Sequence, residues 1–403
     1  MSPILLDIVS RLLSESLQAL QRRLLLRAAH RHGMPIKEGN AVGLLSGGDA
    51  ILDATLKLIR GARRDIRFEM YIWSADTVGR EVLEALLEAR KRGVAVRGMV
   101  DGMGSWGAGG MMAEANKAGA DLRWFHAVAP WRPKVWNRRN HRKLLIVDGG
   151  EAVVGSANWG LDYRPSENAH AFLDVGIILN GPSVDDLVDD FTAAWHRLDG
   201  EFPPKPESNK MGRLWQGTWR ENATVQVVSS ATRGGHLAMR RHFKLLLSQV
   251  QEELVVANAY FLPTRLVLRK IQHLARRGRR VVLLLPGTSD QLFVQAASRH
   301  VYLPLLSAGV RIFERDQIML HAKAAVLDKE SLFTGSANLD PRSFRHNLEL
   351  NLLVRQPELV AEAMTLFEAQ LPFSHEVKAR DWSHRFWIPR LWSWFAYQFR
   401  WWL

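Results

Sequence analysis

The 403-residue chain has no cysteine, and its acidic side chains are outnumbered by basic ones. Without cysteine the fold contains neither disulfide bridges nor thiolate metal ligands, which fits a reducing compartment. There are 54 lysines and arginines against 41 aspartates and glutamates, which gives a formal net charge of +13. A chain with this charge is expected to bind polyanions, either nucleic acid or an anionic membrane surface.

The N-terminal segment, residues 1–36, lacks a long uninterrupted apolar run, because Asp7, Arg11 and Glu15 fall within it. It therefore predicts neither a signal peptide nor a membrane span. Its leucines recur at spacings of three and four residues, which is the pattern of an amphipathic helix. Such a helix packs on the body of the protein in the simpler interpretation, and lies on a lipid surface in the alternative.

Two stretches of the chain are copies of one another in residue type and spacing. A single His-x-Lys triplet is weak evidence in a basic protein, whereas two matching sets of six residues are strong evidence. The first set is His141, Lys143, Asp148, Gly155, Ser156 and Asn158, and the second is His321, Lys323, Asp328, Gly335, Ser336 and Asn338.

Each copy predicts a β-hairpin. Residues 144–147 and 324–327 are short apolar runs that end in aspartate, which is typical of buried strands. Because alternate side chains of a strand share a face, the histidine and lysine of each copy point the same way, as do the serine and asparagine of the return strand. Asp148 has the opposite parity and begins an Asp-Gly-Gly turn. Each hairpin therefore presents four polar side chains together.

This set of side chains suits attack on a phosphodiester. A neutral imidazole is a nucleophile, and a protonated one is a general acid. Lysine supplies positive charge, while serine and asparagine donate to the non-bridging oxygens, where charge gathers in the transition state. Two sets that face one another place a histidine on either side of one phosphorus, without a metal or other cofactor. The alternative, two structural hairpins whose histidines cap turns, does not explain the shared polar face.

These residues resemble the paired His-Lys-Asp signature of the phospholipase D superfamily, and the resemblance covers most of the chain. It implies that one histidine forms a covalent phosphohistidine and that the other serves as acid and base. It favours His141 as the nucleophile and His321 as its partner. Asp148 and Asp328 occupy the acidic position of the signature, where they are expected to hold the loop. Within the superfamily the chain looks most like the shorter bacterial cardiolipin synthases, which lack N-terminal membrane spans.

A further acidic residue follows each copy, at Asp174 and Glu349. Both lie in apolar segments, where an isolated carboxylate is costly unless it is paired. The simplest partner is an imidazole N–H, which would fix the tautomer and leave the other ring nitrogen reactive. The superfamily has such an acid at this position. A charge on an edge strand is the alternative.

The segments around the two copies alternate between strand and helix, and this rhythm predicts largely parallel strands. We expect an α/β protein with the two-repeat phospholipase D fold, in which each half is a mixed β-sheet flanked by helices and the active site lies between the halves. In the first half we expect helices at 50–62 and 80–92 and strands at 66–73 and 94–100. The expected divisions are a helical segment at 1–36, repeats at 37–200 and 223–373, a linker at 201–222 and an interfacial tail at 374–403.

Three features lie outside the duplication. The first repeat has about ten extra residues before its motif, and Trp131 to Arg139 are rich in tryptophan and basic residues that could grip phosphate, lie at a lipid interface or form a solvated loop. Arg342 is a candidate for a headgroup or phosphate contact, or for a loop salt bridge. Residues 382–403 hold six of the 15 tryptophans, with three arginines and Pro389. This tail is typical of an interfacial segment, and a helix docked on the body is the alternative.

The resemblance implies phosphatidyl transfer that makes cardiolipin and glycerol from two phosphatidylglycerols. Phospholipase D hydrolysis and a metal-independent nuclease of the same superfamily are the alternatives, although terminal tryptophans are poorly placed to stack bases in a groove. We therefore expect phospholipid substrates and an anionic membrane surface as partners rather than nucleic acid. The expected location is peripheral, on the cytoplasmic face of the bacterial inner membrane. The acceptor alcohol and the oligomeric state stay open.

Overall fold

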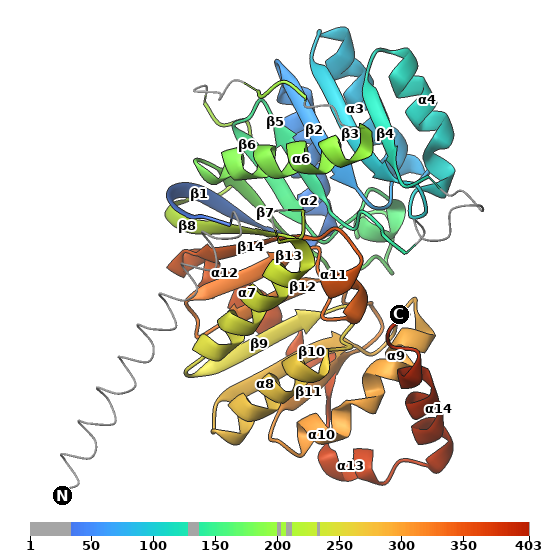
Figure 1. Ribbon diagram of the computed structural model, residues 1–403, viewed down its shortest axis with the longest axis vertical. Coiled ribbons are helices and arrows are strands. Elements are labelled where there is room, and N and C mark those ends of the chain that lie inside the picture. Colours follow the sequence, from blue (N-terminus) through green and yellow to red (C-terminus); the bar gives the residue numbers. More distant parts are fainter. Residues whose placement is uncertain (1–33, 128–136, 200–202, 207–211, 232–233, 403) are drawn as a thin grey trace, which may run out of the picture.

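A mixed sheet of 15 strands runs through the part of the chain that the structure describes, with helices packed on both of its faces (Figure 1). The computed structural model describes residues 34–127, 137–199, 203–206, 212–231 and 234–402. The strands are β1 (Ile36–Ser46), β2 (Asp65–Met70), β3 (Ala95–Asp101), β4 (Asp121–Phe125), β5 (Leu144–Val147), β6 (Glu151–Gly155), β7 (Val175–Asn180), β8 (Arg220–Ser229), β9 (Glu253–Asn258), β10 (Arg280–Pro286), β11 (Arg311–Arg315), β12 (Lys323–Leu327), β13 (Ser331–Gly335), β14 (Leu350–Arg355) and β15 (Ser374–Val377). The helices are α2 (Gly47–Gly61), α3 (Thr77–Lys91), α4 (Gly109–Lys117), α6 (Ser183–Asp199), α7 (Gly235–Gln249), α8 (Arg265–Arg276), α9 (Leu292–His300), α10 (Tyr302–Leu306), α11 (Pro341–Arg345), α12 (Pro357–Glu368), α13 (Ala379–Ser383) and α14 (Trp387–Gln398).

The strand order repeats itself on either side of a central antiparallel pair, β1 and β8. Outward from β1 the order is β7, β6, β5, β2, β3 and β4, and outward from β8 it is β14, β13, β12, β9, β10 and β11. In each half the strand–helix–strand segments give parallel pairs, and the motif hairpin gives antiparallel ones. The expected two mixed α/β halves are confirmed, and the β1–β8 pair joins them into one sheet.

Local contacts explain where elements begin and end. The helix expected at 80–92 begins earlier, at Thr77, because Asp76 caps it by accepting a hydrogen bond from Gly79 N at 2.9 Å. The strand expected at 66–73 ends at Met70, because the backbone then turns toward the motif and Ile72 N donates to a motif asparagine at 3.1 Å.

Two of the expected divisions can be compared with element boundaries. β8 begins at Arg220, inside the segment expected to be a linker, and β15 pairs antiparallel with β11, so the sheet continues past residue 373. The helical prediction for the N-terminal segment falls almost wholly on residues 1–33, which lie outside the described residues. Most of the basic insertion falls on residues 128–136, which also lie outside them.

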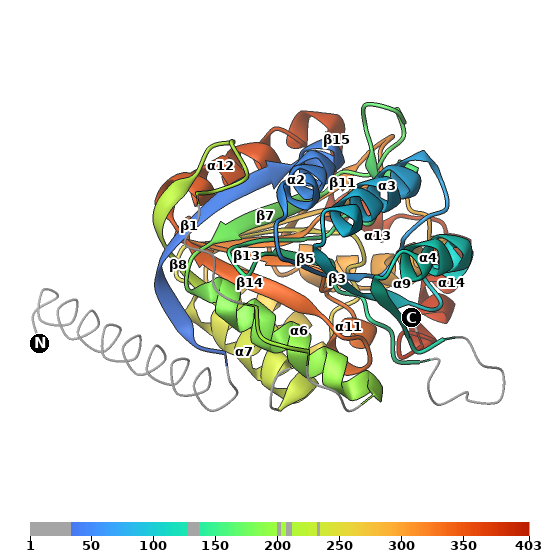
Figure 2. The same cartoon turned by 90° about the horizontal axis from the view of Figure 1, so that it is seen from above.

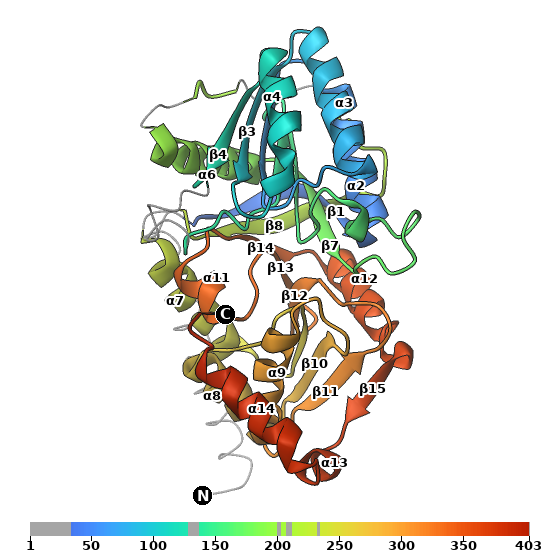
Figure 3. The same ribbon diagram turned by 90° about the vertical axis from the view of Figure 1, so that its right-hand side faces the viewer.

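Three apolar clusters hold these layers together. Helices α2, α3 and α4 pack on one face of the first half, and α7, α8 and α10 pack on one face of the second. The third cluster combines strand side chains of both halves with α6 and α12 (Figures 2 and 3). Because both halves contribute to this inner cluster, its burial fixes the position of one half relative to the other. It therefore also fixes the relative position of the two motif hairpins.

The C-terminal helix α14 lies along α9 in the second half (Figure 3). Ser393 and Ala396 are buried in this contact, and Phe293 of α9 packs edge-on against the ring of Trp392. Much of the remaining aromatic surface is exposed, with Trp387 61% exposed. Helix α14 therefore packs on α9 through a narrow face, and its broader apolar face is exposed. No helix within the described ranges is long and apolar enough to cross a membrane.

Candidate active site

The two motif copies meet through a crossed pairing of the halves. His141 N donates to Leu348 O of the second half at 3.0 Å, and His321 N donates to Leu173 O of the first half at 2.8 Å. Parallel bridges form beside both histidines, and each joins one half to the other. Each histidine thereby lies beside the acidic residue that follows the motif of the opposite half.

Each histidine contacts one buried carboxylate. His141 Nδ1 lies 3.1 Å from Glu349 Oε2, and His321 Nδ1 lies 2.8 Å from Asp174 Oδ1. All four side chains are buried. The imidazole partner predicted for each acid is present, and it comes from the opposite half. Because the carboxylate accepts the Nδ1 proton, Nε2 is the nitrogen left to react.

Burial sets the charge states of these groups. It lowers the pKa of His141 to about 4, and the charge of Lys143 acts in the same direction. Burial also lowers the pKa of His321. Burial alone would raise the pKa values of Glu349 and Asp174, but the adjacent imidazole and lysine groups bring both below their ordinary values. The arrangement therefore favours neutral imidazoles beside ionised carboxylates near neutral pH.

The motif lysines are buried next to the histidines. Lys143 Nζ donates to the carbonyl oxygen of His141 at 2.7 Å, and Lys323 Nζ donates to that of His321 at 2.6 Å. Lys323 Nζ also lies 3.0 Å from Nε2 of His321. Burial lowers the pKa of Lys323 to about 8, and burial followed by the Lys323 charge lowers the pKa of Lys143. An anion such as a phosphate beside these lysines stabilises their protonated form and so raises their pKa values.

The motif serines contact the acids. Ser156 and Ser336 each follow the last residue of a return strand, β6 or β13, so these strands end before the positions expected from the sequence. Their Oγ atoms donate to Asp174 and Glu349, respectively. Neither serine is among the residues that line the cavity between the histidines. In this structure the serines hold the carboxylates that hold the imidazoles.

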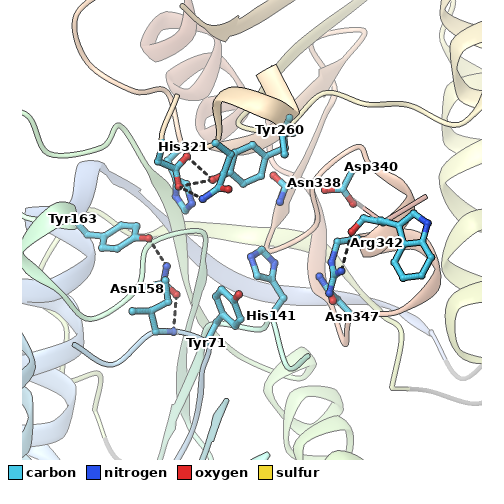
Figure 4. Close-up of a pocket in the computed structure, with 15 residues that line it drawn as sticks. Tyr71, His141, Asn158, Tyr163, Tyr260, His321, Asn338, Asp340, Arg342 and Asn347 are labelled. Carbon is cyan, nitrogen blue, oxygen red and sulfur yellow. Dashed lines mark hydrogen bonds between the residues drawn. The ribbon is translucent and has the colours of Figure 1, made fainter. Parts of the chain in front are cut away.

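A cavity of about 370 Å³ lies between the halves, with both histidines and both motif asparagines in its wall (Figure 4). Both polar atoms of the Asn158 side chain have partners, because its Oδ1 accepts from Ile72 N at 3.1 Å and its Nδ2 donates to the Tyr163 hydroxyl at 2.6 Å. Asn338 Oδ1 is buried and has no hydrogen-bond partner within the described structure. The two asparagines are equivalent in sequence and differ in their freedom to bind a ligand.

The motif aspartates lie in the hairpin turns and outside the cavity wall. Both have a φ of +51°, which is the left-handed region, and aspartate tolerates it better than most residues. Each carboxylate accepts several backbone N–H groups from the start of the strand that pairs antiparallel with its hairpin, β2 or β9. The donors are Arg63, Arg64 and Asp65 for Asp148, and Gln251, Glu252 and Glu253 for Asp328.

The first half contains a buried ionic network that the sequence analysis missed. Arg142 Nη1 lies 2.8 Å from Glu69 Oε1, and Asn140 Nδ2 donates to Glu69 Oε2 at 2.7 Å. The positions of the second half that match Arg142 and Glu69 hold Ala322 and Ala257, so His141 is flanked by a charged network and His321 by apolar side chains. The signal in the sequence was the alternation of Asp65, Arg67 and Glu69 with apolar residues along β2.

Several cavity residues were also missed. The ring of Tyr71 lies 4.8 Å from that of His141, and the ring of Tyr163 lies 5.3 Å from that of His321. Trp402, from the end of the tail, also lines the cavity. Tyr163 follows Asn158 closely in the sequence and could have been noted, whereas the position of Trp402 depends on how the tail folds back.

Comparisons with known proteins identify the family to which the chain belongs. A family model described as "Cardiolipin synthase, PLD-like domain" matches residues 55–195 and 244–371. Cardiolipin synthase B of Escherichia coli K12 is 32% identical over 332 residues, which are 79% of this chain and 77% of that protein. Cardiolipin synthase 2 of Bacillus anthracis is 30% identical over 364 residues, which are 88% of this chain and 70% of that protein.

The likeness extends to a solved structure. The phosphatidylserine synthase of Haemophilus influenzae Rd KW20 superposes with a TM-score of 0.67, over 93% of this chain and 97% of that one. Its sequence identity is 16%, so this likeness concerns the fold. The two-repeat architecture is thus that of phospholipase D-like proteins, and the chain belongs to their cardiolipin synthase family.

Proposed function

We propose that this protein makes cardiolipin and glycerol from two molecules of phosphatidylglycerol. The observation that carries the proposal is the pair of histidines in one cavity, each with its Nδ1 held by a buried carboxylate. Similarity to cardiolipin synthases over most of the chain supports phospholipids as the substrates. The reaction replaces one phosphodiester by another of similar energy, so it requires no nucleotide.

In the first step, Nε2 of His141 attacks the phosphorus of one phosphatidylglycerol. The bond from phosphorus to the glycerol oxygen breaks, and protonated His321 gives that oxygen a proton. Burial keeps His141 neutral and therefore nucleophilic. Burial lowers the pKa of His321 as well, but the carboxylate of Asp174 acts against that lowering and supports the protonated form that this step needs. The amide of Asn338 lines the cavity and can donate to the non-bridging oxygens. The two motif lysines do not line the cavity, and they act on the phosphate through their charge from positions beside the histidines.

In the second step, neutral His321 removes the proton from a hydroxyl group of a second phosphatidylglycerol. The hydroxyl oxygen attacks the phosphohistidine, and the bond from phosphorus to His141 Nε2 breaks. This step releases cardiolipin and regenerates both imidazoles. Water in place of the lipid alcohol gives phosphatidic acid, so hydrolysis is the competing reaction of the same intermediate.

The test is to incubate purified protein with detergent-dispersed phosphatidylglycerol in excess chelator, and in parallel with DNA. We expect cardiolipin and glycerol in equal amounts. Phosphatidic acid as the sole lipid product would assign a hydrolase, and cleavage of DNA without lipid turnover would assign a nuclease. Complete loss of activity in chelator, restored by a divalent ion, would contradict the two-histidine mechanism.

The order of the histidines has its own test. His141→Ala and His321→Ala should each abolish turnover while preserving the thermal melting transition. Lipid labelled in the phosphatidyl group should leave an acid-labile label on the wild-type protein and on the His321 variant, but not on the His141 variant. Loss of labelling in the His321 variant instead would reverse the two roles.

We also propose that helix α14 contacts an anionic bilayer, which would make this a peripheral protein of the cytoplasmic face of the bacterial inner membrane. Trp387 and Leu391 are both more than half exposed, at 61% and 53%, and Arg390 lies between them in the sequence. Aromatic rings with interspersed arginines suit the headgroup region of an anionic membrane. Trp402, at the end of the same C-terminal tail, lines the cavity, so the tail connects α14 with the site.

A further inference from the structure

The two halves contribute unlike walls to the cavity, although they match in sequence spacing. After Asn338 the second half has Asp340 and Arg342 at the next two alternate positions, and both line the cavity (Figure 4). The matching positions after Asn158 are Gly160, which has no side chain, and Asp162, which is exposed and does not line it. The polar groups of the cavity are thus concentrated on the second-half wall, which also carries His321.

The same asymmetry appears two residues before each acid. Asn347 precedes Glu349, lines the cavity and is 8% exposed, and its Oδ1 is buried without a hydrogen-bond partner in the described structure. The matching residue in the first half is Phe172, whose ring packs against that of His321 at 5.5 Å. A buried amide oxygen left unpaired costs free energy, and a ligand hydroxyl that pairs with it recovers that cost.

Arg342 is fixed in position by the chain around it. Its Nη1 donates to Asn137 Oδ1 and to the carbonyl oxygen of Trp402, each at 3.1 Å. Asp340 is 6% exposed and caps α11 by accepting from Ser343 N at 2.7 Å. A guanidinium group and a carboxylate therefore share one wall with the unpaired amide. One side-chain and one backbone contact orient the guanidinium group, and a backbone N–H orients the carboxylate.

We infer that Asp340, Arg342 and Asn347 form a subsite for an alcohol that carries its own phosphodiester. The attacking hydroxyl group of a glycerol unit gives its proton to His321, and the other hydroxyl group donates to the acceptors of Asn347 and Asp340. Arg342 pairs with the phosphate attached to that unit. The inference rests on the proposed function, and it adds the reason why a second phosphatidylglycerol, rather than glycerol or water, receives the phosphatidyl group. Charge-assisted pairing of a guanidinium group with phosphate is strong and geometrically selective.

The experiment compares three acceptors in one reaction. Detergent-dispersed phosphatidylglycerol is the donor, and radiolabelled glycerol is added. Cardiolipin then reports the anionic acceptor, labelled phosphatidylglycerol reports the neutral alcohol and phosphatidic acid reports water. Arg342→Gln should lower the ratio of cardiolipin to labelled phosphatidylglycerol about tenfold or more. Asn347→Leu should lower both alcohol products relative to phosphatidic acid.

Arg345→Gln is the matched control, because it removes one positive charge from the same short helix. Arg345 is exposed and lies over the ring of Trp401, 4.3 Å from its centre, and it does not line the cavity. Its product ratios should equal those of the wild type. Arg342→Lys, which keeps the charge, should recover part of the cardiolipin ratio and guards against a loss caused by misfolding.

Unchanged product ratios in Arg342→Gln and Asn347→Leu, with wild-type melting temperatures, would overturn the subsite. An equal shift in the Arg345→Gln control would show a general charge effect and would overturn it as well. Absence of cardiolipin from the wild-type reaction is a different result, because it contradicts the proposed function itself.

Discussion

At the scale of single residues, each histidine depends on a carboxylate from the opposite half. Glu349 accepts from His141, and Asp174 accepts from His321, at 3.1 and 2.8 Å. A serine oxygen donates to each acid in turn. This series of contacts fixes the ring orientation and keeps Nε2 free of the tautomeric proton. A free Nε2 is required for His141 to attack phosphorus and for His321 to take a proton from the second alcohol.

Replacing either acid by its amide should therefore slow the step that its histidine performs. We expect Glu349→Gln to slow formation of the labelled phosphoryl-enzyme by about 10- to 100-fold, because the amide no longer selects the Nδ1–H tautomer. Asp174→Asn should slow labelling as well, because His321 is the acid of that step, and it should also slow release of the label, because His321 is the base of the second step. Rapid-quench measurements with labelled lipid separate the two steps. Release of the label that is as fast in Asp174→Asn as in the wild type would show that Asp174 does not act through His321 in the second step.

The buried lysine gives a prediction about pH. The pKa of Lys323 is about 8, because burial disfavours its charge. Below that pH the ammonium group attracts the substrate phosphate, and above it the charge is lost. We therefore expect kcat/KM to fall as the pH rises through about 8. Lys323→Gln should be weakly active and should lack this alkaline decline. A decline that persists unchanged in this variant would assign it to another group.

At the scale of elements, the motif aspartates join each hairpin turn to the beginning of the strand beside it, β2 or β9. Each carboxylate accepts three backbone N–H groups from the beginning of β2 or β9. The turn thus anchors the hairpin that carries the histidine to the strand beside it. The contacts of each motif aspartate therefore indicate a structural role, although the aspartate belongs to the same motif as the reacting groups.

Asp148→Ala should accordingly reduce stability more than chemistry. It removes three hydrogen bonds and places a β-carbon without a polar group at a positive φ, for a total of about 2 to 4 kcal/mol. Asp148→Asn keeps the tolerance for this backbone conformation and should cost less. Urea denaturation measures both. Activity per folded molecule at low temperature should stay within about twofold of the wild type. A large loss of activity at unchanged stability would mean that Asp148 acts on the substrate.

At the scale of the whole molecule, the duplicated halves share a fold but contribute different side chains to the cavity. The β1–β8 pair and the shared inner cluster hold the halves together, so that their motif hairpins meet at one cavity. The first half surrounds His141 with a buried ionic network, and the second half supplies most of the polar wall. The C-terminal tail then brings Trp402 to that cavity and leaves the face of α14 exposed.

If the exposed face of α14 lies on the membrane, removing its apolar side chains should weaken binding without disturbing the fold. We expect the double variant Trp387→Gln, Leu391→Gln to lose about 30- to 800-fold in affinity for phosphatidylglycerol vesicles, since each apolar side chain contributes about 1 to 2 kcal/mol. Sedimentation with vesicles measures this. Activity on detergent-dispersed lipid should be retained.

Leu237→Gln is the control for that experiment, because Leu237 is a similarly exposed leucine, 45% accessible, on the distant helix α7 (Figure 2). It should bind vesicles like the wild type. Unchanged binding in the double variant would place the membrane contact elsewhere, with the N-terminal segment and the basic insertion as the next candidates.

The sequence by itself determined the duplication, the hairpins and the chemistry of the site. These depend on local information, because turn residues, apolar runs and the alternation of side chains along a strand act over a few residues. His141 and His321, with their lysines and aspartates, could therefore be identified before any fold was known. The structure agrees that the two α/β halves bring both histidines to one cavity.

The tertiary structure alone decided which groups meet. The crossed pairs of His141 with Glu349 and His321 with Asp174 depend on contacts between the halves, and the spacing within each copy contains no information about them. For the same reason the sequence did not separate Asn158, whose amide is engaged, from Asn338, whose oxygen is unpaired. Equal motifs differ here because their neighbours come from distant parts of the chain, and packing rather than local propensity selects those neighbours.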